Sequence, residues 1–287
     1  MTFRLGLVLA VALVSISSTA LVVRYVDDVP ALVLAFWRML TASSMLWAYS
    51  AFKPKGRLSL HQKKLILLAG FFLGCHFACF FLGVRHTSIS NATFLGCMVP
   101  IFTVFIAFMM KKEINRMTYV GLGIALLGAG IIQFEDMSLA GENMFGNSIA
   151  LLGAFFIAIT FVIASKVRET TDIVMYGRLL FFVAAVTLLL IAIMVGDSVL
   201  DFNKSHIPWF LFLGFVPSIL GHNLLNYAIK YVTPTAITSI PLGEPIIASL
   251  FGFLLFQEAV PAGALMGGPV ILIGIYLILK NQDPVSG

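Results

Sequence analysis

Apolar runs long enough to cross a lipid bilayer recur along the whole chain, and they leave little freedom of fold. A transmembrane helix needs about 20 consecutive apolar residues, and the 287-residue chain contains such runs repeatedly, separated by short polar breaks. Charged residues make up 11% of the chain, where a soluble domain carries roughly a quarter. The alternating pattern of a transmembrane barrel is missing. The sequence therefore predicts an all-α polytopic membrane protein.

Polar breaks divide the chain into ten predicted transmembrane helices. The first run resembles a signal peptide, with one basic residue before an apolar core, but it continues to about Val23 and many spans follow. We therefore expect it to be the first transmembrane helix. The predicted spans lie near residues 5–23, 31–52, 65–84, 89–110, 118–134, 146–165, 173–195, 208–229, 236–256 and 263–280.

The distribution of basic residues predicts the orientation. If the N-terminus is cytoplasmic, 13 of the 18 Lys and Arg residues fall in cytoplasmic segments, three in external loops and two inside spans. Cytoplasmic loops of membrane proteins carry such an excess. Both termini are therefore predicted to be cytoplasmic, in a bacterial or archaeal inner membrane. The net charge of +5 then reflects topology, so the lipid bilayer is an expected partner and nucleic acid is not.

An internal repeat relates the two halves of the chain. A shift of 145 residues places PIFTVFIAFMMKKE, Pro100–Glu113, on PIIASLFGFLLFQE, Pro245–Glu258, and a shift of 140 places Arg38 on Arg178. Each half holds five spans. Because five is an odd number, the second half must enter the membrane from the opposite side, as in transporters with inverted repeats. The sequence predicts two such five-helix repeats, residues 1–137 and 138–287.

These blocks, the glycine-rich runs YVGLGIALLGAGII and LMGGPVILIGIYLIL and the motif FWR make the chain resemble the EamA-type members of the drug/metabolite transporter superfamily. The resemblance covers essentially the whole chain. It implies a central cavity between the halves, alternating access, and a substrate such as an amino acid, a nucleotide sugar or a quaternary amine. In the family the last span of each half lies toward the subunit interface, which makes a homodimer the expected assembly to test. The glycines of these two spans are otherwise expected to allow close helix contact.

A carboxylate between two prolines marks the ninth span. Glu244 lies about nine residues beyond Thr235, at a depth of roughly 13 Å in a core of about 30 Å. Pro241 and Pro245 each remove a backbone donor and free a carbonyl four residues earlier. The stretch PLGEP therefore predicts a broken helix whose carboxylate faces a cavity. There Glu244 would carry a proton or bind a substrate ammonium; the alternative is a carboxylate that locks two helices together.

Other polar residues inside spans are candidates for substrate binding, because each is costly unless it faces the bundle or water. The fork of Arg38 suits a carboxylate or phosphate, with Trp37 as a stacking face, but a structural role is equally open. Arg178 is expected to snorkel to the surface. Polar groups on the third and eighth spans either line a cavity or join helices. The candidates are Trp37, Arg38, His76, Tyr176, His222, Asn223, Asn226, Tyr227 and Glu244.

These features predict a secondary transporter of small polar metabolites. No enzyme signature or nucleotide-binding loop is present, and no cofactor is expected. Cys75, His76 and Cys79 have helical metal-ligand spacing but lack a fourth ligand, so no metal site is predicted. One buried cation and one buried anion suit an amino-acid-like zwitterion, moved by export or exchange. The alternatives are uptake of a quaternary amine in an aromatic cage of Trp37, Tyr176 and Tyr227, a nucleotide-sugar antiporter, and a membrane protein that does not transport.

Overall fold

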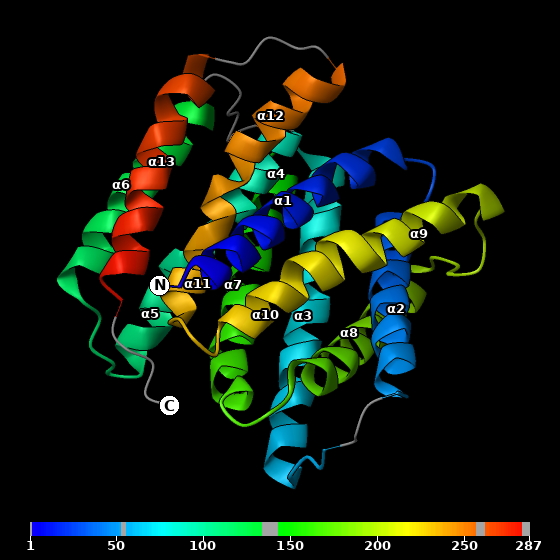
Figure 1. Ribbon diagram of the computed structural model, residues 1–287. Helices are drawn as coiled ribbons and strands as arrows, with labels where there is room; N and C mark the ends of the chain where they lie inside the picture. The colour runs from blue at the N-terminus through cyan, green and yellow to red at the C-terminus, as the bar shows by residue number, and fades with distance from the viewer. Residues whose placement is uncertain (1, 53–55, 134–142, 257–261, 283–287) are drawn as a thin grey trace.

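The computed structural model of the protein describes residues 2–52, 56–133, 143–256 and 262–282, and every regular element in these ranges is helical (Figure 1). The predicted boundary between residues 137 and 138, Glu258 and residues 283–287 of the polar tail lie outside the described residues. In chain order the elements are α1 (Phe3–Tyr25), α2 (Ala31–Ser50), α3 (Leu60–His86), α4 (Ile89–Gly96), α5 (Val99–Met109), α6 (Arg116–Gln133), α7 (Met144–Arg168), α8 (Ile173–Val195), η2 (Lys204–His206), α9 (Ile207–Leu213), η3 (Gly214–Asn223), α10 (Leu224–Ala228), α11 (Pro234–Ser239), η4 (Ile240–Gly243), α12 (Glu244–Phe256) and α13 (Ala262–Lys280).

The predicted helical membrane fold is confirmed. Among the described residues, eight helical segments are long and apolar enough to cross a membrane, and α6 is a shorter apolar helix. The predicted span near 236–256 is occupied by α11, η4 and α12. Large apolar side chains such as Leu67, Phe71 and Leu254 are exposed on the outside of the bundle. Such a surface is unfavourable in water and suits contact with lipid tails.

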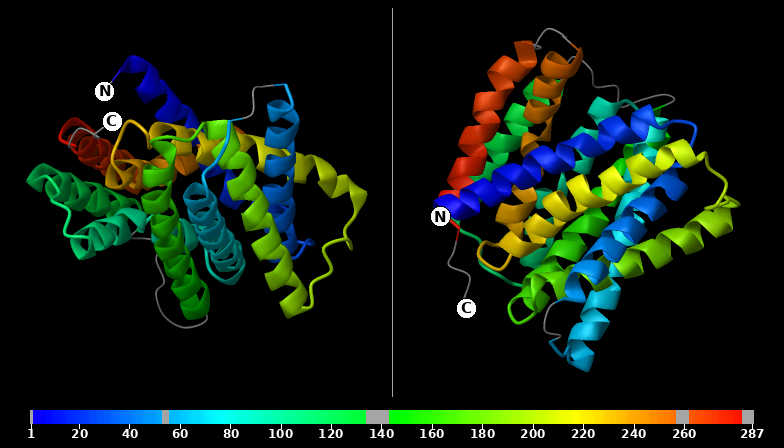
Figure 2. Two further views of the ribbon diagram at one scale, coloured as in Figure 1. Left: turned by 90° about the horizontal axis from the view of Figure 1, so that it is seen from below. Right: turned by 45° about the vertical axis from the view of Figure 1, so that its right-hand side comes forward.

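Helix contacts come in pairs that an exchange of the two halves would produce. The third span, α3, packs on the sixth, α7, and the first span, α1, packs on η3 of the eighth. In the repeat the first span corresponds to the sixth and the third to the eighth. Exchanging the halves therefore converts one of these contacts into the other. The second span packs on the seventh, α2 on α8, and the fifth on the tenth, α6 on α13 (Figures 1 and 2); each of these contacts maps onto itself. The repeat boundaries themselves stay a prediction.

Three of the predicted spans are interrupted. The fourth span ends its first helix at Gly96 and resumes at Val99, because Pro100 has no N–H to bond the Gly96 carbonyl. The eighth span contains the π-helical segment η3 around Pro217. In the ninth, a 3-10 turn at Ile240–Gly243 stands where the prolines predict a break. The interruptions in the fourth and eighth spans were not predicted.

Glycines bring α6 and α13 together. A Cβ added at Gly267 would lie 2.4 Å from the carbonyl oxygen of Gly128, and one at Gly274 would lie 2.4 Å from the backbone nitrogen of Ala125. These distances leave room only for hydrogen, so the backbones of the two helices touch. Gly123 and Gly130 also lie on α6, but a Cβ added at either one would have no atom within 4 Å. The expected role in close packing therefore holds for part of the glycine set.

We expect Gly267→Ala to destabilise the protein and Gly123→Ala to leave its stability unchanged or slightly raised. The first methyl meets the Gly128 backbone, which cannot rotate away, and such overpacking costs about 1–3 kcal/mol. The second meets nothing within 4 Å and gains up to about 1 kcal/mol of helix propensity. Thermal unfolding of the two purified variants in one detergent measures the difference. Equal melting temperatures would contradict the contact between α6 and α13.

Candidate functional site

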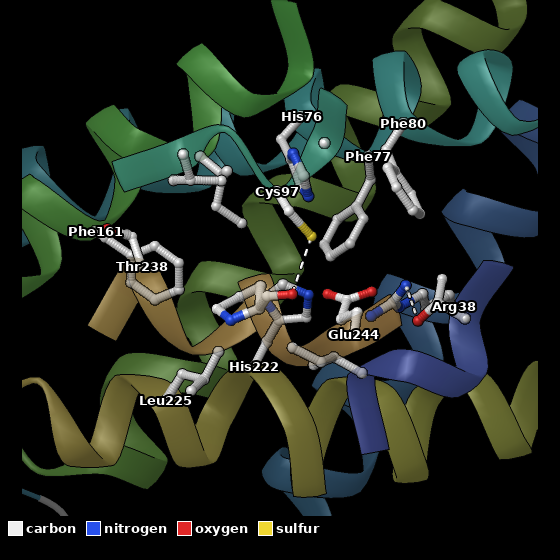
Figure 3. Close-up of a pocket in the computed structure, with 16 residues that line it drawn as sticks. Arg38, His76, Phe77, Phe80, Cys97, Phe161, His222, Leu225, Thr238 and Glu244 are labelled. Carbon is white, nitrogen blue, oxygen red and sulfur yellow. Dashed lines mark hydrogen bonds between the residues drawn. The ribbon is translucent and has the colours of Figure 1, made fainter. Parts of the chain in front are cut away.

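A small polar cavity lies at the centre of the bundle, where α1, α2, α3 and α7 meet the three interrupted spans (Figure 3). Its volume is about 50 Å³, enough for a few water molecules, since each needs about 10–15 Å³ by this measure. For a guest larger than this the helices would have to move apart. The polar side chains of the lining are Thr19, Arg38, His76, Cys97, His222, Thr238 and Glu244. The apolar side chains are Ile16, Phe77, Phe80, Val99, Ile157, Phe161, Leu225 and Pro241, and Gly96 completes the wall.

Arg38, on α2, is the fully buried cation of the cavity, with no exposed surface. Its Nε donates to the Ser218 hydroxyl at 2.8 Å, and Nη1 donates to the Thr19 hydroxyl at 3.3 Å. The guanidinium lies over the Phe77 ring, 4.3 Å from the centroid. Its Nη2 is buried without a hydrogen-bond partner. A buried charged donor of this kind is costly unless a ligand or water bonds it, so the two N–H groups of Nη2 are free to bond a guest.

The π-helical segment η3 supplies the partner of Arg38. Pro217 has no N–H for the Leu213 carbonyl, and the Ser218 hydroxyl donates to that carbonyl instead, at 2.7 Å. The same hydroxyl oxygen accepts the bond from Arg38. π-Helical turns recur at functional sites, and this one turns Ser218 toward α2. One serine thus holds both the irregular helix and the buried cation in place.

We expect Ser218→Ala to destabilise the fold by about 1–3 kcal/mol, because it leaves the Arg38 Nε unsatisfied in the core. Ser148→Ala is the matched control. Its hydroxyl also bonds a carbonyl within its own helix, that of Met144 at 2.8 Å, but on an exposed face. That change should stay within about 0.5 kcal/mol. Thermal unfolding followed by tryptophan fluorescence compares the two; equal effects would contradict the role of Ser218.

Glu244 begins α12 directly after the 3-10 turn, and its carboxylate points into the cavity toward Arg38 (Figure 3). The guanidinium of Arg38 and the carboxyl group of Glu244 both line this cavity. They form no direct ion pair, since the only one among the described residues joins His206 and Asp28. The site therefore holds a cation and an anion that face a common space without neutralising each other by contact.

The broken fourth and ninth spans meet beside Glu244. The Cys97 thiol, at the break between α4 and α5, donates to the Pro241 carbonyl at 3.1 Å (Figure 3). Pro245 cannot bond that carbonyl in the α-helical pattern; the Glu244 N–H reaches it across the 3-10 turn instead. The Pro241 carbonyl is therefore bonded outside the α-helical pattern, and the cysteine of the other half is one of its two partners.

Two histidines form another wall of the cavity. His76 on α3 and His222 in η3 have ring centroids 6.2 Å apart. His76 Nδ1 lies 2.9 Å from the Gly153 carbonyl oxygen. Because a carbonyl only accepts, Nδ1 carries the proton, and in the neutral form of the ring Nε2 is an acceptor. The structure thus brings together His76 and His222, which the sequence aligns only through the repeat.

Two other predicted candidates do not line this cavity. The Trp37 ring stacks on Phe210, with centroids 5.7 Å apart, and its indole N–H donates to the Val199 carbonyl at 2.8 Å. It therefore does not stack on a ligand of its neighbour Arg38. Tyr176 is fully buried in α8.

The candidates that follow His222 also lie elsewhere. Asn223 packs against α8, where its Oδ1 would be 2.4 Å from a Cβ added at Gly177. Asn226 is buried, and its backbone carbonyl accepts from Arg168 Nε at 3.0 Å. Tyr227 pairs with Tyr231 at 5.5 Å and lines a separate cavity near Arg4. The three residues of the expected aromatic cage, Trp37, Tyr176 and Tyr227, are not brought together.

Several residues of the site were missed or given another role by sequence reasoning. Cys97 reads as a small apolar residue, and Thr19 belongs to a run of hydroxyls that usually serve helix packing. Phe77 and Thr238 carry no polar signal that separates them from other residues of their spans. Ser218 has a recognisable signal: it is the hydroxyl directly after a proline inside an apolar run.

No group of three His, Cys, Asp or Glu side chains in the described part of the chain is placed to hold a metal ion. Cys75, Cys79 and Cys97 are free thiols. The chemistry offered by the central cavity is that of charge pairing and hydrogen bonding to a guest.

A helical membrane bundle with interrupted spans around a buried polar cavity is the architecture of a membrane transporter. The model of the EamA-like transporter family matches residues 4–134 and 144–280. The chain belongs to this family, as its sequence motifs predict, and is a multi-pass membrane transporter and not an enzyme.

Named relatives agree with this assignment. The pseudopaline exporter CntI of Pseudomonas aeruginosa is 26% identical over 268 residues, which cover 92% of this chain and 91% of the exporter. The transporter YdfC of Bacillus subtilis is 25% identical over 261 residues, 88% of this chain and 84% of that protein. An uncharacterized transporter of Archaeoglobus fulgidus is 25% identical over 207 residues, 71% of this chain and 72% of that one. A solved crystal structure with 15% identity superposes with a TM-score of 0.78 over 96% of this chain and 97% of the other, which shows a shared fold.

Proposed function

We propose that the protein is a secondary transporter of small zwitterionic metabolites of the amino-acid type, which it exports or exchanges by alternating access. The observation that carries this proposal is the arrangement of Arg38 and Glu244. They face one cavity without direct contact, and Arg38 keeps an unused buried donor. A substrate carboxylate on Arg38 and a substrate ammonium on Glu244 would compensate both charges at once.

The other walls of the cavity fit such a guest. Phe77, Phe80 and Phe161 offer an apolar surface for a side chain, and the His76 acceptor adds a hydrogen bond. A quaternary amine is less well served, because its expected cage residues lie apart and a buried guanidinium lines the cavity. A nucleotide sugar would need several cations for its phosphates, and Arg38 is the one Lys or Arg side chain in the described lining.

Access to the central cavity is expected from the end of the bundle where the described part of the chain begins, at Thr2, and ends, at Gln282. A second cavity, of about 120 Å³, lies there between α5, α7 and α11. The same three helices line the central cavity. The hydroxyl oxygens of Thr103 and Thr238 lie 3.1 Å apart between the two, so this pair would be the closed gate. At the opposite end, Arg85 donates to the Asp27 carbonyl at 2.7 Å and to that of Val29 at 3.0 Å, which ties the loop after α1 to α3.

Orientation, assembly and coupling belong to the same proposal. The excess of Lys and Arg on one side supports cytoplasmic termini in an inner membrane, so the threonine gate would face the cytoplasm. The name of the pseudopaline exporter supports export. Glu244 is the proposed proton carrier if transport is coupled to a proton gradient. A homodimer through the last span of each repeat, 1–137 and 138–287, stays part of the proposal.

Counterflow in proteoliposomes tests the substrate class. Vesicles loaded with an unlabelled amino acid, a choline-type amine or a nucleotide sugar are offered the labelled compound, and empty vesicles serve as the control. Accumulation of amino acids alone supports the proposal, and accumulation of the amine alone or the nucleotide sugar alone overturns it. Glu244→Gln then separates the roles of the carboxylate: a proton carrier loses its response to a pH gradient and keeps counterflow, whereas a substrate ligand loses both.

A further inference from the structure

Another cavity, distinct from those above and away from the central site, lies at the end of the bundle where the described part of the chain begins and ends. It has a volume of about 550 Å³ and lies where α2 ends and α3 and α8 begin. Seven polar side chains of the described residues line it, namely Ser50, Arg57, Gln62, Thr170, Thr171, Asp172 and Arg178. The transport mechanism uses none of them.

Arg178 is the buried cation of this cavity. The sequence predicts that its side chain extends to the surface, and the structure shows instead that it is buried. Its side chain is 9% exposed, with the guanidinium over the Trp47 ring at 4.2 Å and Nη1 donating to the Ser50 hydroxyl at 2.8 Å. Its Nε is buried and has no hydrogen-bond partner. No acidic side chain of the described residues forms an ion pair with it. A buried guanidinium without a counter-ion is costly, and here it borders an open cavity.

The hydroxyls across the cavity are arranged to donate. Gln62 Nε2 donates to the hydroxyl oxygens of Thr170, at 2.8 Å, and Thr171, at 3.1 Å. The glutamine is itself held in the capping box of α3 through Ser59. A hydroxyl that accepts from an amide keeps its own proton for another acceptor. Both threonines therefore present O–H donors, the complement of an anion.

The balance of charge favours the same kind of ligand. Arg57 and Arg178 supply two positive charges, and Asp172 is the one acid among the described residues of the lining. The Asp172 carboxylate caps α8 by accepting from the N–H groups of Val174, at 2.9 Å, and Met175, at 3.2 Å. Its charge thus already compensates the positive end of that helix. Guanidinium groups with hydroxyl donors are the usual partners of phosphate.

We infer that this cavity binds a phosphate group through Arg178, Arg57, Thr170 and Thr171, carried either by an anionic phospholipid or by a soluble phosphate. The inference does not depend on the proposed substrate of the central cavity. Exposed Leu60, Leu67 and Phe71 on α3 offer an apolar surface on the same helix that a lipid tail could follow, whereas a soluble phosphate needs only the polar groups.

Two binding measurements on the purified full-length protein separate these sources. The first is the melting temperature in detergent against added inorganic phosphate, with chloride at equal ionic strength as the control. The second is native mass spectrometry of protein offered phosphatidylglycerol and phosphatidylcholine in equal amounts. Stabilisation by phosphate identifies a soluble ligand, and selective retention of phosphatidylglycerol without it identifies a lipid headgroup. If neither effect is observed, the inference is overturned.

Variants test whether the binding belongs to this cavity. Arg57→Gln removes an exposed cation of the lining and is expected to weaken the observed binding at least tenfold without loss of folding. Thr171→Val should weaken it severalfold by removing one donor. Lys64→Gln, an exposed cation of α3 outside the lining, should leave binding within twofold of the native protein. Unchanged binding in Arg57→Gln, or an equal loss in Lys64→Gln, would show general attraction of anions to the basic surface and overturn the site.

Discussion

Arg38→Gln is expected to lower substrate counterflow at least 100-fold while the protein still folds. The change removes the cation that a substrate carboxylate would meet in the central cavity. It also removes the donors to Ser218 and Thr19, although glutamine retains one amide that can bond a hydroxyl. Breaking a charged network in a core costs about 3–5 kcal/mol when one charge is left alone. The melting temperature therefore falls as well, and both quantities must be measured.

Substrate-induced stabilisation separates binding from folding in this experiment. A ligand at 100 times its Kd stabilises a folded protein by about 2.7 kcal/mol. The native protein should gain that stability from substrate, whereas Arg38→Gln should fold and gain none. Arg178→Gln is the matched control, since it removes the other buried arginine of the repeat pair from outside the central cavity. It should retain counterflow within a few-fold. If Arg38→Gln transports normally, Arg38 has a structural role and the zwitterion proposal fails.

Glu244→Gln combined with Arg38→Gln should show strong non-additivity. If both groups hold one substrate, losing either already abolishes productive binding, and the double variant is little worse than the single ones. Loss of both charges also removes the lone buried charge that destabilises each single variant. The double variant should therefore melt at a higher temperature than Arg38→Gln alone. Independent losses that multiply would contradict a shared substrate.

A disulfide between residues 103 and 238 is expected to stop transport completely and reversibly. The hydroxyl oxygens of Thr103 and Thr238 lie 3.1 Å apart, so sulfur atoms in their place need to approach by only about 1 Å to reach the disulfide length of about 2.05 Å. In the double variant Thr103→Cys/Thr238→Cys, oxidation would hold α5 and α11 together. Counterflow should fall to the level of empty vesicles and return after reduction.

The single variants Thr103→Cys and Thr238→Cys control for the three native cysteines. They should transport equally before and after oxidation, because each variant introduces only one of the two thiols that the engineered bond requires. Mass spectrometry after proteolysis verifies that the engineered bond has formed. If the bond forms and transport continues, the path does not pass between these threonines, and another opening must connect the cavity to the aqueous phase.

Hydropathy and proline chemistry were enough to predict most of the fold. A span must satisfy its backbone within itself in lipid, so each long apolar run reads as a helix, and Pro241 and Pro245 marked the stretch where the ninth span changes to a 3-10 turn. Pro100 and Pro217 remove a backbone donor in the same way, but the break in the fourth span and the π-helix of the eighth were not predicted.

The residue pattern could not show which side chains of a span face the cavity and which face lipid. In a soluble helix the polar face points to water, but a transmembrane helix is apolar toward both lipid and its neighbours. Hydrophobic periodicity therefore gives no direction for Trp37 or Tyr227, and both lie away from the central cavity. Charged residues are the exception, because burial is costly enough to force them inward, and Arg38 and Glu244 do line the cavity.

The order of residues along the chain is enough to predict a helical membrane protein of the EamA-like family, with two opposite charges inside its spans and a broken ninth span. It does not predict that Arg38 bonds Ser218 across 180 positions of sequence, nor that Cys97 bonds the Pro241 carbonyl. These contacts depend on how spans from different halves pack against one another. Local propensity and hydropathy act within a span, whereas the position of one helix against another is set by side-chain shape and hydrogen bonding over the whole bundle.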